Sequence, residues 1–310
     1  MVFMGTPALA AHILDRLAAA SGDKFQIVAV VTQPDRPRGR KLEPAPSEVA
    51  VAANRHGIPT LKPEKIRTRE FLGGIEALAP DLLVVAAYGR ILPEGVLNAP
   101  RIAPINIHAS LLPRFRGAAP VEAAILAGDS ETGVTLIRMT AKMDAGPVYL
   151  KRAIPIAPDD TQGSVKEKLA ELGASAVLEG LNLLIAGRLD ETPQDESLAT
   201  YCKPVEKNDA VIDWNQPAAQ VERMIRAYDP WPVARTTLDG SPLMIWRAAI
   251  NAAEPAGVPG EIISISPAPV VKCGTGALSL LEVQAPGRKR MPAADFFRGR
   301  RIGVGTRMGE

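Results

Sequence analysis

The stretch DLLVVAAY, at residues 81–88, decides the fold class. It is a continuous apolar run, which is typical of a strand buried on both faces of a parallel sheet. Further strand patterns lie at residues 1–4, 25–32, 104–110, 133–140 and 147–156, and helical patterns lie at 8–20, 47–56 and 161–189. Strands that alternate with helices indicate an α/β fold with a mainly parallel sheet.

The pattern changes in the last third of the chain. A chain of 310 residues exceeds the roughly 250–300 residues that one core usually serves, so we expect two domains. Residues 190–204 are polar and aperiodic, which predicts a linker between domains at 1–189 and 205–310. A helical pattern lies at 217–228, and five short strand patterns follow at 235–238, 243–249, 261–264, 270–273 and 278–284. Short strands separated by Asp and Gly turns predict a small β-barrel.

The composition excludes several classes of protein. Apolar residues make up 46% and charged residues 23% of the chain, as in a globular protein with a large core. No secretory signal precedes the first strand, and no apolar run reaches the roughly 18–20 residues of a membrane span. Cys202 and Cys273 are too few for a disulfide framework and lack the CxxC spacing of zinc sites. We therefore predict a cytoplasmic protein without a membrane anchor or a metal site.

The three histidines are candidates for chemistry. His12 lies in a helical pattern and is expected to pack or to face solvent. His56 precedes Gly57 at a helix end, where an imidazole suits the negative end of the helix dipole. His108 differs from both, because it lies near the end of the strand pattern at 104–110.

Asn106 and His108 share one face of that strand, because side chains two residues apart point the same way. On a buried strand, each unpaired polar group would cost roughly 1–3 kcal/mol. Ligands of open α/β sheets bind beyond the carboxyl ends of the strands, and both residues lie near such an end. We interpret them as site residues, and a hydrogen-bonded pair within the core is the alternative.

Asp144 lies in the turn Met-Asp-Ala-Gly at 143–146, between two strand patterns. An Asp before a small residue and a Gly is usually a turn residue. The alternative is that its carboxylate orients the His108 imidazole.

The stretch NIHASLLPRFRG at 106–117, with DAG at 144–146, resembles the signature of the folate-dependent formyltransferases. That signature is Asn-x-His, then Ser-Leu-Leu-Pro and a nearby Gly, then a downstream Asp-x-Gly. The resemblance is strongest to the branch that formylates initiator methionyl-tRNA, and it extends over segments at 3–7, 32–40, 87–93, 117–120, 226–232 and 287–292. It covers essentially the whole chain.

The resemblance implies a Rossmann-like catalytic domain and a C-terminal tRNA-binding barrel similar to the oligonucleotide-binding (OB) fold. It implies 10-formyltetrahydrofolate as the formyl donor and methionyl-initiator tRNA as the acceptor, for translation initiation. It makes Asn106, His108 and Asp144 the catalytic residues. The folate site is implied at Ser110, Leu111, Leu112, Pro113, Tyr88, Gly89 and Ile91.

Contacts to tRNA are expected in two basic segments. A Pro/Gly loop follows the second strand, at the same edge of the sheet as His108, and carries Arg36, Arg38, Arg40 and Lys41. By resemblance, the part around Arg40 meets the acceptor end. The second segment is 286–310, with seven Lys or Arg and two acids, where we select Lys289 and Arg290. Such segments are usually solvated surfaces, and phosphate contact is the alternative.

Two features depart from the family pattern. The first strand is two or more residues shorter than usual, which predicts a start codon upstream. The basic loop is short after Arg40, so individual lysines there carry less weight. We expect a monomer.

The residue types suit acyl transfer. An Asn amide and an imidazolium can donate hydrogen bonds to the oxygen that becomes negative, and one such donor is typically worth about 2.7–4 kcal/mol of barrier. Asp144 would hold His108 in its protonated form and accept the proton of the amine, directly or through water.

Three other functions stay open. A formyltransferase for an amino-sugar nucleotide or a purine precursor would share the fold, but not the basic loop and second domain. A nicotinamide-dependent oxidoreductase would need GxGxxG at residues 5–10, which read GTPALA, and an acid after the second strand, where Thr-Gln-Pro stands. A non-catalytic RNA-binding module would carry an aromatic RNA-binding motif, which is lacking.

Overall fold

The computed structural model describes residues 1–22, 24–38, 43–252 and 254–309. These residues form two compact units. The first comprises Met1–Pro120, Glu131–Pro155 and Lys166–Lys203, and the second comprises Val121–Ser130, Ile156–Val165 and the described chain from Pro204 onward. A compact unit need not be a domain that folds independently. The expected domain boundaries, 1–189 and 205–310, therefore stay a prediction. Among the described residues, no helix is both long enough and apolar enough to cross a membrane.

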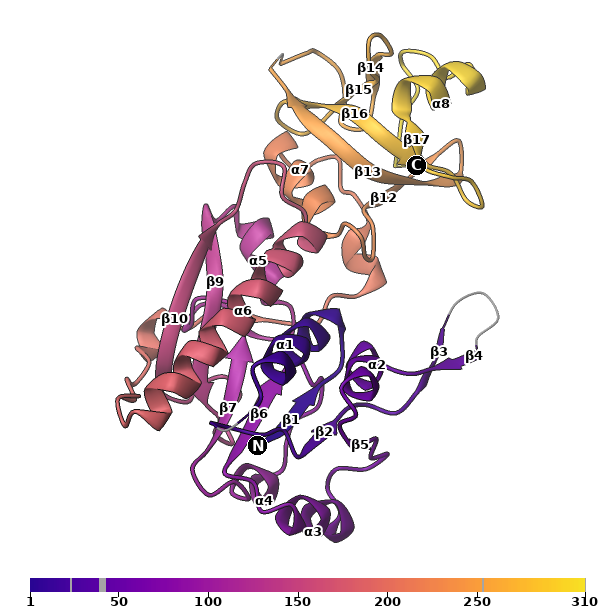
Figure 1. The fold of residues 1–310 in the computed structure, drawn as a ribbon. Coiled ribbons are helices and arrows are strands. Elements are labelled where there is room, and N and C mark those ends of the chain that lie inside the picture. Colours follow the sequence, from indigo (N-terminus) through magenta and orange to yellow (C-terminus); the bar gives the residue numbers. More distant parts are fainter. Residues whose placement is uncertain (23, 39–42, 253, 310) are drawn as a thin grey trace. The chain divides into compact units, whose positions relative to one another are not determined.

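The first unit holds a seven-stranded sheet (Figure 1). Its strands are β1 (Val2–Gly5), β2 (Ala29–Val31), β5 (Thr60–Leu61), β6 (Leu82–Ala86), β7 (Ala103–His108), β9 (Glu131–Arg138) and β10 (Val148–Pro155). They lie in the order β10-β9-β7-β6-β1-β2-β5. From β7 to β5 every neighbouring pair is parallel, whereas β9 and β10 are antiparallel additions. The expected α/β fold with a mainly parallel sheet is therefore confirmed.

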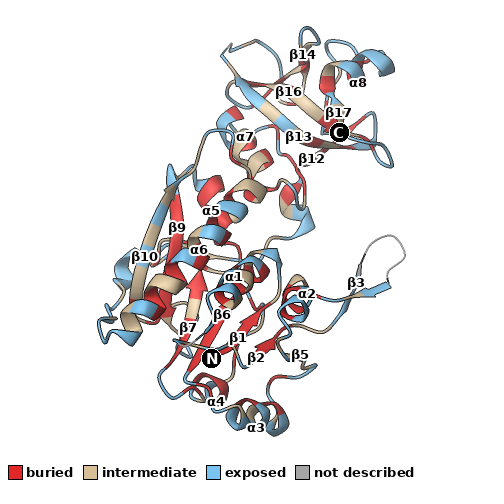
Figure 2. Cartoon of the chain, in the orientation of Figure 1, coloured by how far each residue is buried: buried red, intermediate tan, exposed pale blue. Residues whose placement is uncertain are grey.

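Helices cover both faces of this sheet. They are α1 (Ala8–Ala19), α2 (Glu48–Arg55), α3 (Arg69–Ala77), α4 (Glu94–Leu97) and α6 (Gln162–Ile185), which enters the unit at Lys166. Apolar residues of α3 and α4 pack against one face of β1, β2 and β6. On the other face, Gly173 of α6 lies against Ile13 of α1 and Ile107 of β7. Because helices cover both faces, β6 is buried along its whole length, as its apolar run predicts (Figure 2).

The hydrogen-bonding partners of His12 and His56 support the structural interpretation of both residues. His12 Nε2 lies 2.8 Å from Glu171, and His56 Nε2 lies 2.8 Å from Asp15. His56 also ends helix α2, whose first turn is capped by the Ser47 hydroxyl. Neither histidine belongs to the site at the sheet edge.

The second unit contains an antiparallel sheet in the order β12-β13-β16-β15-β14, with β17 beside β16. These strands are β12 (Arg235–Leu238), β13 (Ser241–Asn251), β14 (Ile262–Ser264), β15 (Val270–Lys272), β16 (Ala277–Gln284) and β17 (Met291–Pro292). The helices are α5 (Pro120–Ala127), α7 (Ala218–Ala227) and α8 (Ala293–Arg300), and a short 3₁₀ turn, η2, spans Lys207–Ala210. The five strand patterns expected from sequence all correspond to observed strands.

The sheet of the second unit closes on itself through residues 305–309. Gly309 N donates to Thr237 O of β12 at 2.9 Å, and Met308 N donates to Gly260 O, just before β14, at 2.9 Å. These bonds connect the two edge strands of the sheet, β12 and β14, so the expected small barrel is confirmed. Closure satisfies backbone groups that an open edge would leave unpaired.

Two segments differ from the expectation. The basic stretch after β2, expected to be a loop, contains the antiparallel strands β3 (Arg36–Arg38) and β4 (Glu43–Ala45). The basic tail, for which no structure was expected, contains α8, which buries Phe296 and Phe297. In both segments, Pro and Arg residues interrupt the apolar periodicity by which a strand or helix is recognised in a sequence.

Candidate active site

Strand β7 places Asn106 and His108 at the carboxyl edge of the parallel sheet. Its register with β6 pairs Asn106 with Val85, so the strand ends and the loops after them lie side by side. Asn106 is half-buried and His108 is buried, while Ile107 faces α6. The strand therefore presents its apolar residues to the helix and its two polar residues to the opposite side.

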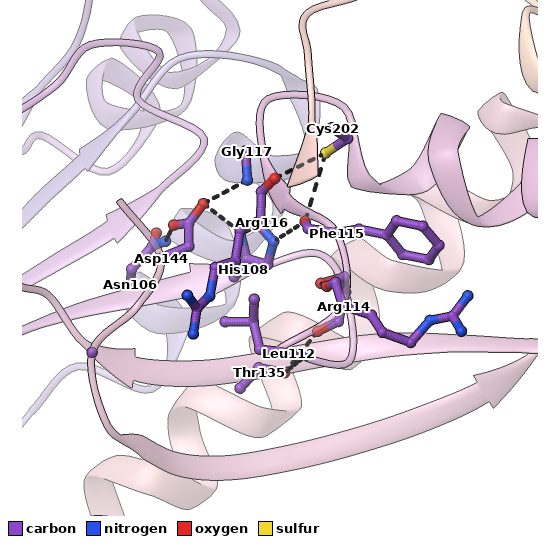
Figure 3. Close-up of polar contacts among 12 residues, drawn as sticks. Asn106, His108, Leu112, Arg114, Phe115, Arg116, Gly117, Thr135, Asp144 and Cys202 are labelled. Carbon is purple, nitrogen blue, oxygen red and sulfur yellow. Dashed lines mark hydrogen bonds and ion pairs between the residues drawn. The ribbon is translucent and has the colours of Figure 1, made fainter. Parts of the chain in front are cut away.

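Asp144 reaches the same place from the turn between β9 and β10 (Figure 3). Its Oδ1 accepts a hydrogen bond from Asn106 Nδ2 at 3.3 Å, and its Oδ2 accepts one from Gly117 N at 2.9 Å. The turn is tight, because a Cβ on Gly146 would lie 1.8 Å from Arg138 O. Glycine at 146 therefore allows the turn to carry the carboxylate back over β7.

Both ring nitrogens of His108 face acceptors. Nε2 lies 2.9 Å from Phe115 O, and Nδ1 lies 3.6 Å from Asp144 Oδ2. A carbonyl oxygen only accepts, so Nε2 carries a hydrogen and Nδ1 is the nitrogen that faces Asn106 and Asp144. The structure thus brings the amide, imidazole and carboxylate together, and it directs one specific nitrogen toward them.

The loop after β7 is held by buried and partly buried hydrogen bonds. Ser110 Oγ donates to Arg114 O at 2.7 Å, and Thr135 Oγ1 on β9 donates to Ser110 O at 2.7 Å. The Leu112 side chain is 1% exposed and packs with Ile137. Ser110 and Leu112 therefore shape the loop, while Leu111 and Pro113 are its half-buried members. The role of these four residues in folate binding stays a prediction.

The other residues expected at the folate site follow β6. Tyr88 is buried, and burial raises the pKa of its phenol, although the charge of Arg90 opposes that rise. Its hydroxyl has no partner among the described residues. Gly89 has a φ of +80°, and Ile91, 60% exposed, lines an open cavity of about 480 Å³ with Arg90.

The residues expected to contact tRNA in the first unit lie in or beside the β3–β4 hairpin. Arg36 is exposed on β3, and its guanidinium has a long contact of 3.5 Å with Gln33 Oε1. Arg38 ends β3. Arg40 and Lys41 lie outside the described residues. The hairpin follows β2, so it belongs to the same edge of the sheet as His108.

The two residues selected in the basic tail have different surroundings within the second unit. Lys289 is exposed. The Arg290 guanidinium lies 3.1 Å from the centre of the Trp246 ring and 3.3 Å from Asp229 Oδ1. Burial raises the pKa of Asp229, and the Arg290 charge partly offsets that rise. Arg290 therefore has structural partners of its own, and its role toward tRNA stays a prediction.

Several residues that support the site escape prediction from sequence. Arg116 lies within the 106–117 motif, but nothing there shows that it is fully buried and paired with Glu196. Gln194, Glu196 and Thr200 belong to the polar stretch that predicts a linker. Polar residues in an aperiodic stretch predict a linker. Only the hydrogen bonds that these residues make to partners distant in sequence show that they support the site.

The first unit thus has a Rossmann-like α/β architecture, and an Asn, a His and an Asp converge at the carboxyl edge of its sheet. Residues 1–181 match the sequence model described as formyl transferase, and residues 204–301 match that of the formyl transferase C-terminal domain. The chain belongs to the formyl transferase family.

Named relatives are similar over the full length. A methionyl-tRNA formyltransferase of Geobacter sulfurreducens is 45% identical, with 100% of this chain and 96% of the relative covered. One of Methylococcus capsulatus is 48% identical, with 100% and 99% covered. Among solved structures, the sugar 3N-formyltransferase WlaRD, crystallised with dTDP and 5-N-formyl-THF, is similar with a TM-score of 0.68. It is 16% identical, with 93% of this chain and 98% of that chain covered, so it shows the shared fold.

Proposed function

We propose that this protein transfers the formyl group of 10-formyltetrahydrofolate to the amino group of methionyl-initiator tRNA, for translation initiation. One observation carries the proposal: the side chains of Asn106, His108 and Asp144 converge at the carboxyl edge of the sheet. Membership of the formyl transferase family supports the reaction type. Full-length similarity to methionyl-tRNA formyltransferases supports the acceptor.

In formyl transfer the amine attacks the formyl carbon, and the formyl oxygen becomes negative. The Asn106 amide has two N–H groups, and one of them donates a hydrogen bond to the Asp144 carboxylate. We assign the other N–H group as a hydrogen-bond donor to the formyl oxygen. When the ring is protonated, His108 Nδ1–H is the second hydrogen-bond donor to the formyl oxygen, because the Nε2–H group already donates to Phe115 O. Prepositioned donors of this kind each lower the barrier by about 2.7–4 kcal/mol.

The amine must lose a proton as its nitrogen bonds to the formyl carbon. We assign the Asp144 carboxylate as the acceptor of that proton, directly or through one water. The bond between the formyl carbon and N10 of the folate then breaks, and N10 takes up a proton. The products are a formylated amine and tetrahydrofolate, with no net release of protons.

Apolar surface beside the site suits a flat donor. Ile91 is 60% exposed and Met143, which precedes the catalytic carboxylate, is 50% exposed. Cofactor pockets combine apolar walls with a few well-placed polar groups. We therefore propose that the donor binds between the loop after β6 and the loop after β7. The residues assigned to it are Tyr88, Gly89, Ile91, Ser110, Leu111, Leu112 and Pro113.

For the acceptor, we propose phosphate contacts by the basic hairpin and by the second unit. The exposure of Arg36 supports this role, because phosphate contacts need accessible cations. Arg38, Arg40 and Lys41 are assigned with it, as are Lys289 and Arg290. We keep 1–189 as the catalytic domain and 205–310 as the tRNA-binding domain. A cytoplasmic monomer is the proposed form; a chain of 310 residues with only two cysteines suits a reducing compartment.

The deciding experiment offers the purified protein 10-formyltetrahydrofolate with charged initiator tRNA, an amino-sugar nucleotide or a purine-precursor amine. We expect transfer to the tRNA alone, and a rate at least about 100-fold lower in His108→Ala. Turnover of either small amine at a comparable rate, or an unchanged rate in the variant, would contradict the proposal. Light scattering of the same sample measures the oligomeric state.

A further inference from the structure

The segment 192–202, here called the strap, lies within the first unit and is hydrogen-bonded along its length to other parts of that unit. Thr192 pairs with Val148 through two backbone hydrogen bonds of 2.7 and 2.9 Å. At the other end, β11 (Tyr201–Cys202) pairs in parallel with β8 (Arg116–Gly117). A polar, aperiodic stretch usually makes few hydrogen bonds to the rest of a protein. The strap, by contrast, is hydrogen-bonded at both ends.

Gln194 connects two loops of the site through a single amide. Its Nε2 donates to the backbone oxygens of Asp144 at 2.8 Å and Gly146 at 2.7 Å. Its Oε1 accepts from Arg116 Nη2 at 2.8 Å and Nε at 3.2 Å. Both hydrogens and both lone pairs of the amide are therefore used.

Arg116 is fully buried, although its main partner lies on the surface. Its guanidinium forms a two-pronged pair with the Glu196 carboxylate, at 2.7 and 3.1 Å. Glu196 also accepts from Lys142 Nζ at 2.7 Å, next to the turn that carries Asp144. Gln194 and Glu196 thus each contact the Arg116 loop and the Asp144 turn.

The two loops linked by the strap hold the proposed catalytic groups. The Arg116 loop supplies Phe115 O, which orients the His108 ring, and Gly117 N, which binds the Asp144 carboxylate. The strap fixes this loop a second time, since Phe115 N donates to Thr200 Oγ1 at 2.8 Å and Arg116 N donates to Thr200 O at 2.8 Å. The distance between His108 Nδ1 and Asp144 therefore depends on how the strap spaces the two loops.

We propose that Gln194 is a positioning residue, which sets the spacing of the His108 ring and the Asp144 carboxylate through the strap's contacts to Arg116. This proposal rests on the catalytic roles assigned above. Gln194 touches neither substrate in this scheme and acts only through the two loops. A displacement of about 1 Å in such a site can cost about 100-fold in rate.

The test is Gln194→Glu, which keeps the size and the Arg116 contact but loses both donor hydrogens. Two carbonyl oxygens would then face a carboxylate, so the Asp144 turn should move away. With both substrates saturating, we expect single-turnover formyl transfer to fall by about 10–100-fold. The concentrations that half-saturate the enzyme should change by less than about threefold, because no binding group is altered.

A second readout needs no substrate. The protein has three histidines, so long-range ¹H–¹⁵N spectra of the ring nitrogens can be assigned with His108→Asn. Gln194→Glu should shift the His108 nitrogen signals, while those of His12 and His56, which pair with carboxylates elsewhere, stay in place. This measurement stays informative even if the acceptor is not tRNA, so failure of the proposed function would be recognised separately.

The matched control is Glu191→Gln, next to the strap, because Glu191 contacts Arg138 and Tyr149 but neither loop. It should leave the transfer rate and the His108 signals unchanged. If Gln194→Glu does not fold, Glu196→Gln replaces it, since that side chain is 55% exposed, and a loss of about 2–5-fold is expected with the same direction of His108 shift. Unchanged His108 signals together with a rate within twofold of the parent in the folded variant would overturn the proposal.

Discussion

Two segments that leave the same edge of the first sheet are built in opposite ways. The loop after β7 buries Ser110 and Arg116 and bonds its backbone to the strap and to β9. The hairpin after β2 exposes Arg36, whose guanidinium makes a long contact of 3.5 Å with Gln33 Oε1. Acyl transfer needs donors fixed to within a fraction of an ångström, whereas phosphate contacts need accessible charge. The difference predicts which substitutions affect rate and which affect affinity.

The largest effect is expected from Asn106→Ala. Removing a donor to the developing oxygen should lower single-turnover transfer by about 100–1,000-fold, with little change in melting temperature. The matched control is Asn54→Ala on the exposed face of α2, which should leave the rate unchanged. A rate within a few-fold of the parent in Asn106→Ala would remove the oxyanion role from this residue.

The next effect tests the rigidity of the loop after β7. Gly117 has a φ of +119°, and a Cβ there would lie 2.2 Å from Cys202 O. Gly117→Ala should therefore lower the free energy of unfolding by about 2 kcal/mol or more, measured by denaturant titration. In Gly73→Ala, on the open surface of α3, nothing lies within 4 Å of the new Cβ, so a gain of about 0.5–1 kcal/mol is expected. Equal behaviour of the two variants would show that the loop is not tightly held.

A smaller effect is expected in the hairpin. Arg36→Ala should weaken tRNA binding several-fold and lower the slope of log affinity against log salt by about 1, while donor binding stays constant. Arg101→Ala is the control, because Arg101 pairs with Asp81 just before β6, at the opposite edge of the sheet. If both variants had the same salt slope as the parent, phosphate contact by Arg36 would be excluded.

The smallest effect concerns the outer end of the strap. The Arg116 guanidinium, followed by the Lys142 ammonium, lowers the pKa of Glu196 from 4.5 to about 2. A carboxyl whose pKa is depressed on folding stabilises the protein fully above its unfolded pKa, and that contribution disappears as pH falls through the folded value. The melting temperature of the parent should therefore exceed that of Glu196→Gln slightly at pH 7, and the difference should shrink between pH 4.5 and 2. A difference independent of pH would exclude this ion pair as its source.

The sequence predicts best where one local pattern determines the outcome. The apolar run at 81–88 predicts the buried β6, and residue spacing places Asn106 and His108 on one face of β7. Neither argument requires knowledge of distant residues. The DAG turn at 144–146 is recognisable from its residues, but only the resemblance favours a site role for Asp144 over a turn role, because its contact with His108 spans residues far apart in sequence.

The strap could not be predicted for a physical reason. Its polar residues satisfy a buried arginine and several backbone groups rather than solvent, and the sequence pattern is the same in both cases. Arg116 and Gln194 are 78 residues apart in the chain, and no periodicity connects them. The same ambiguity hid the β3–β4 hairpin, whose Pro and Arg residues are also typical of a loop.

The closure of the second unit has a consequence for how the protein is made. Residues 305–309 join β12 to β14, so the barrel cannot be completed until these residues have left the ribosome. Until then β12 and β14 remain open edges, to which another chain can add a strand.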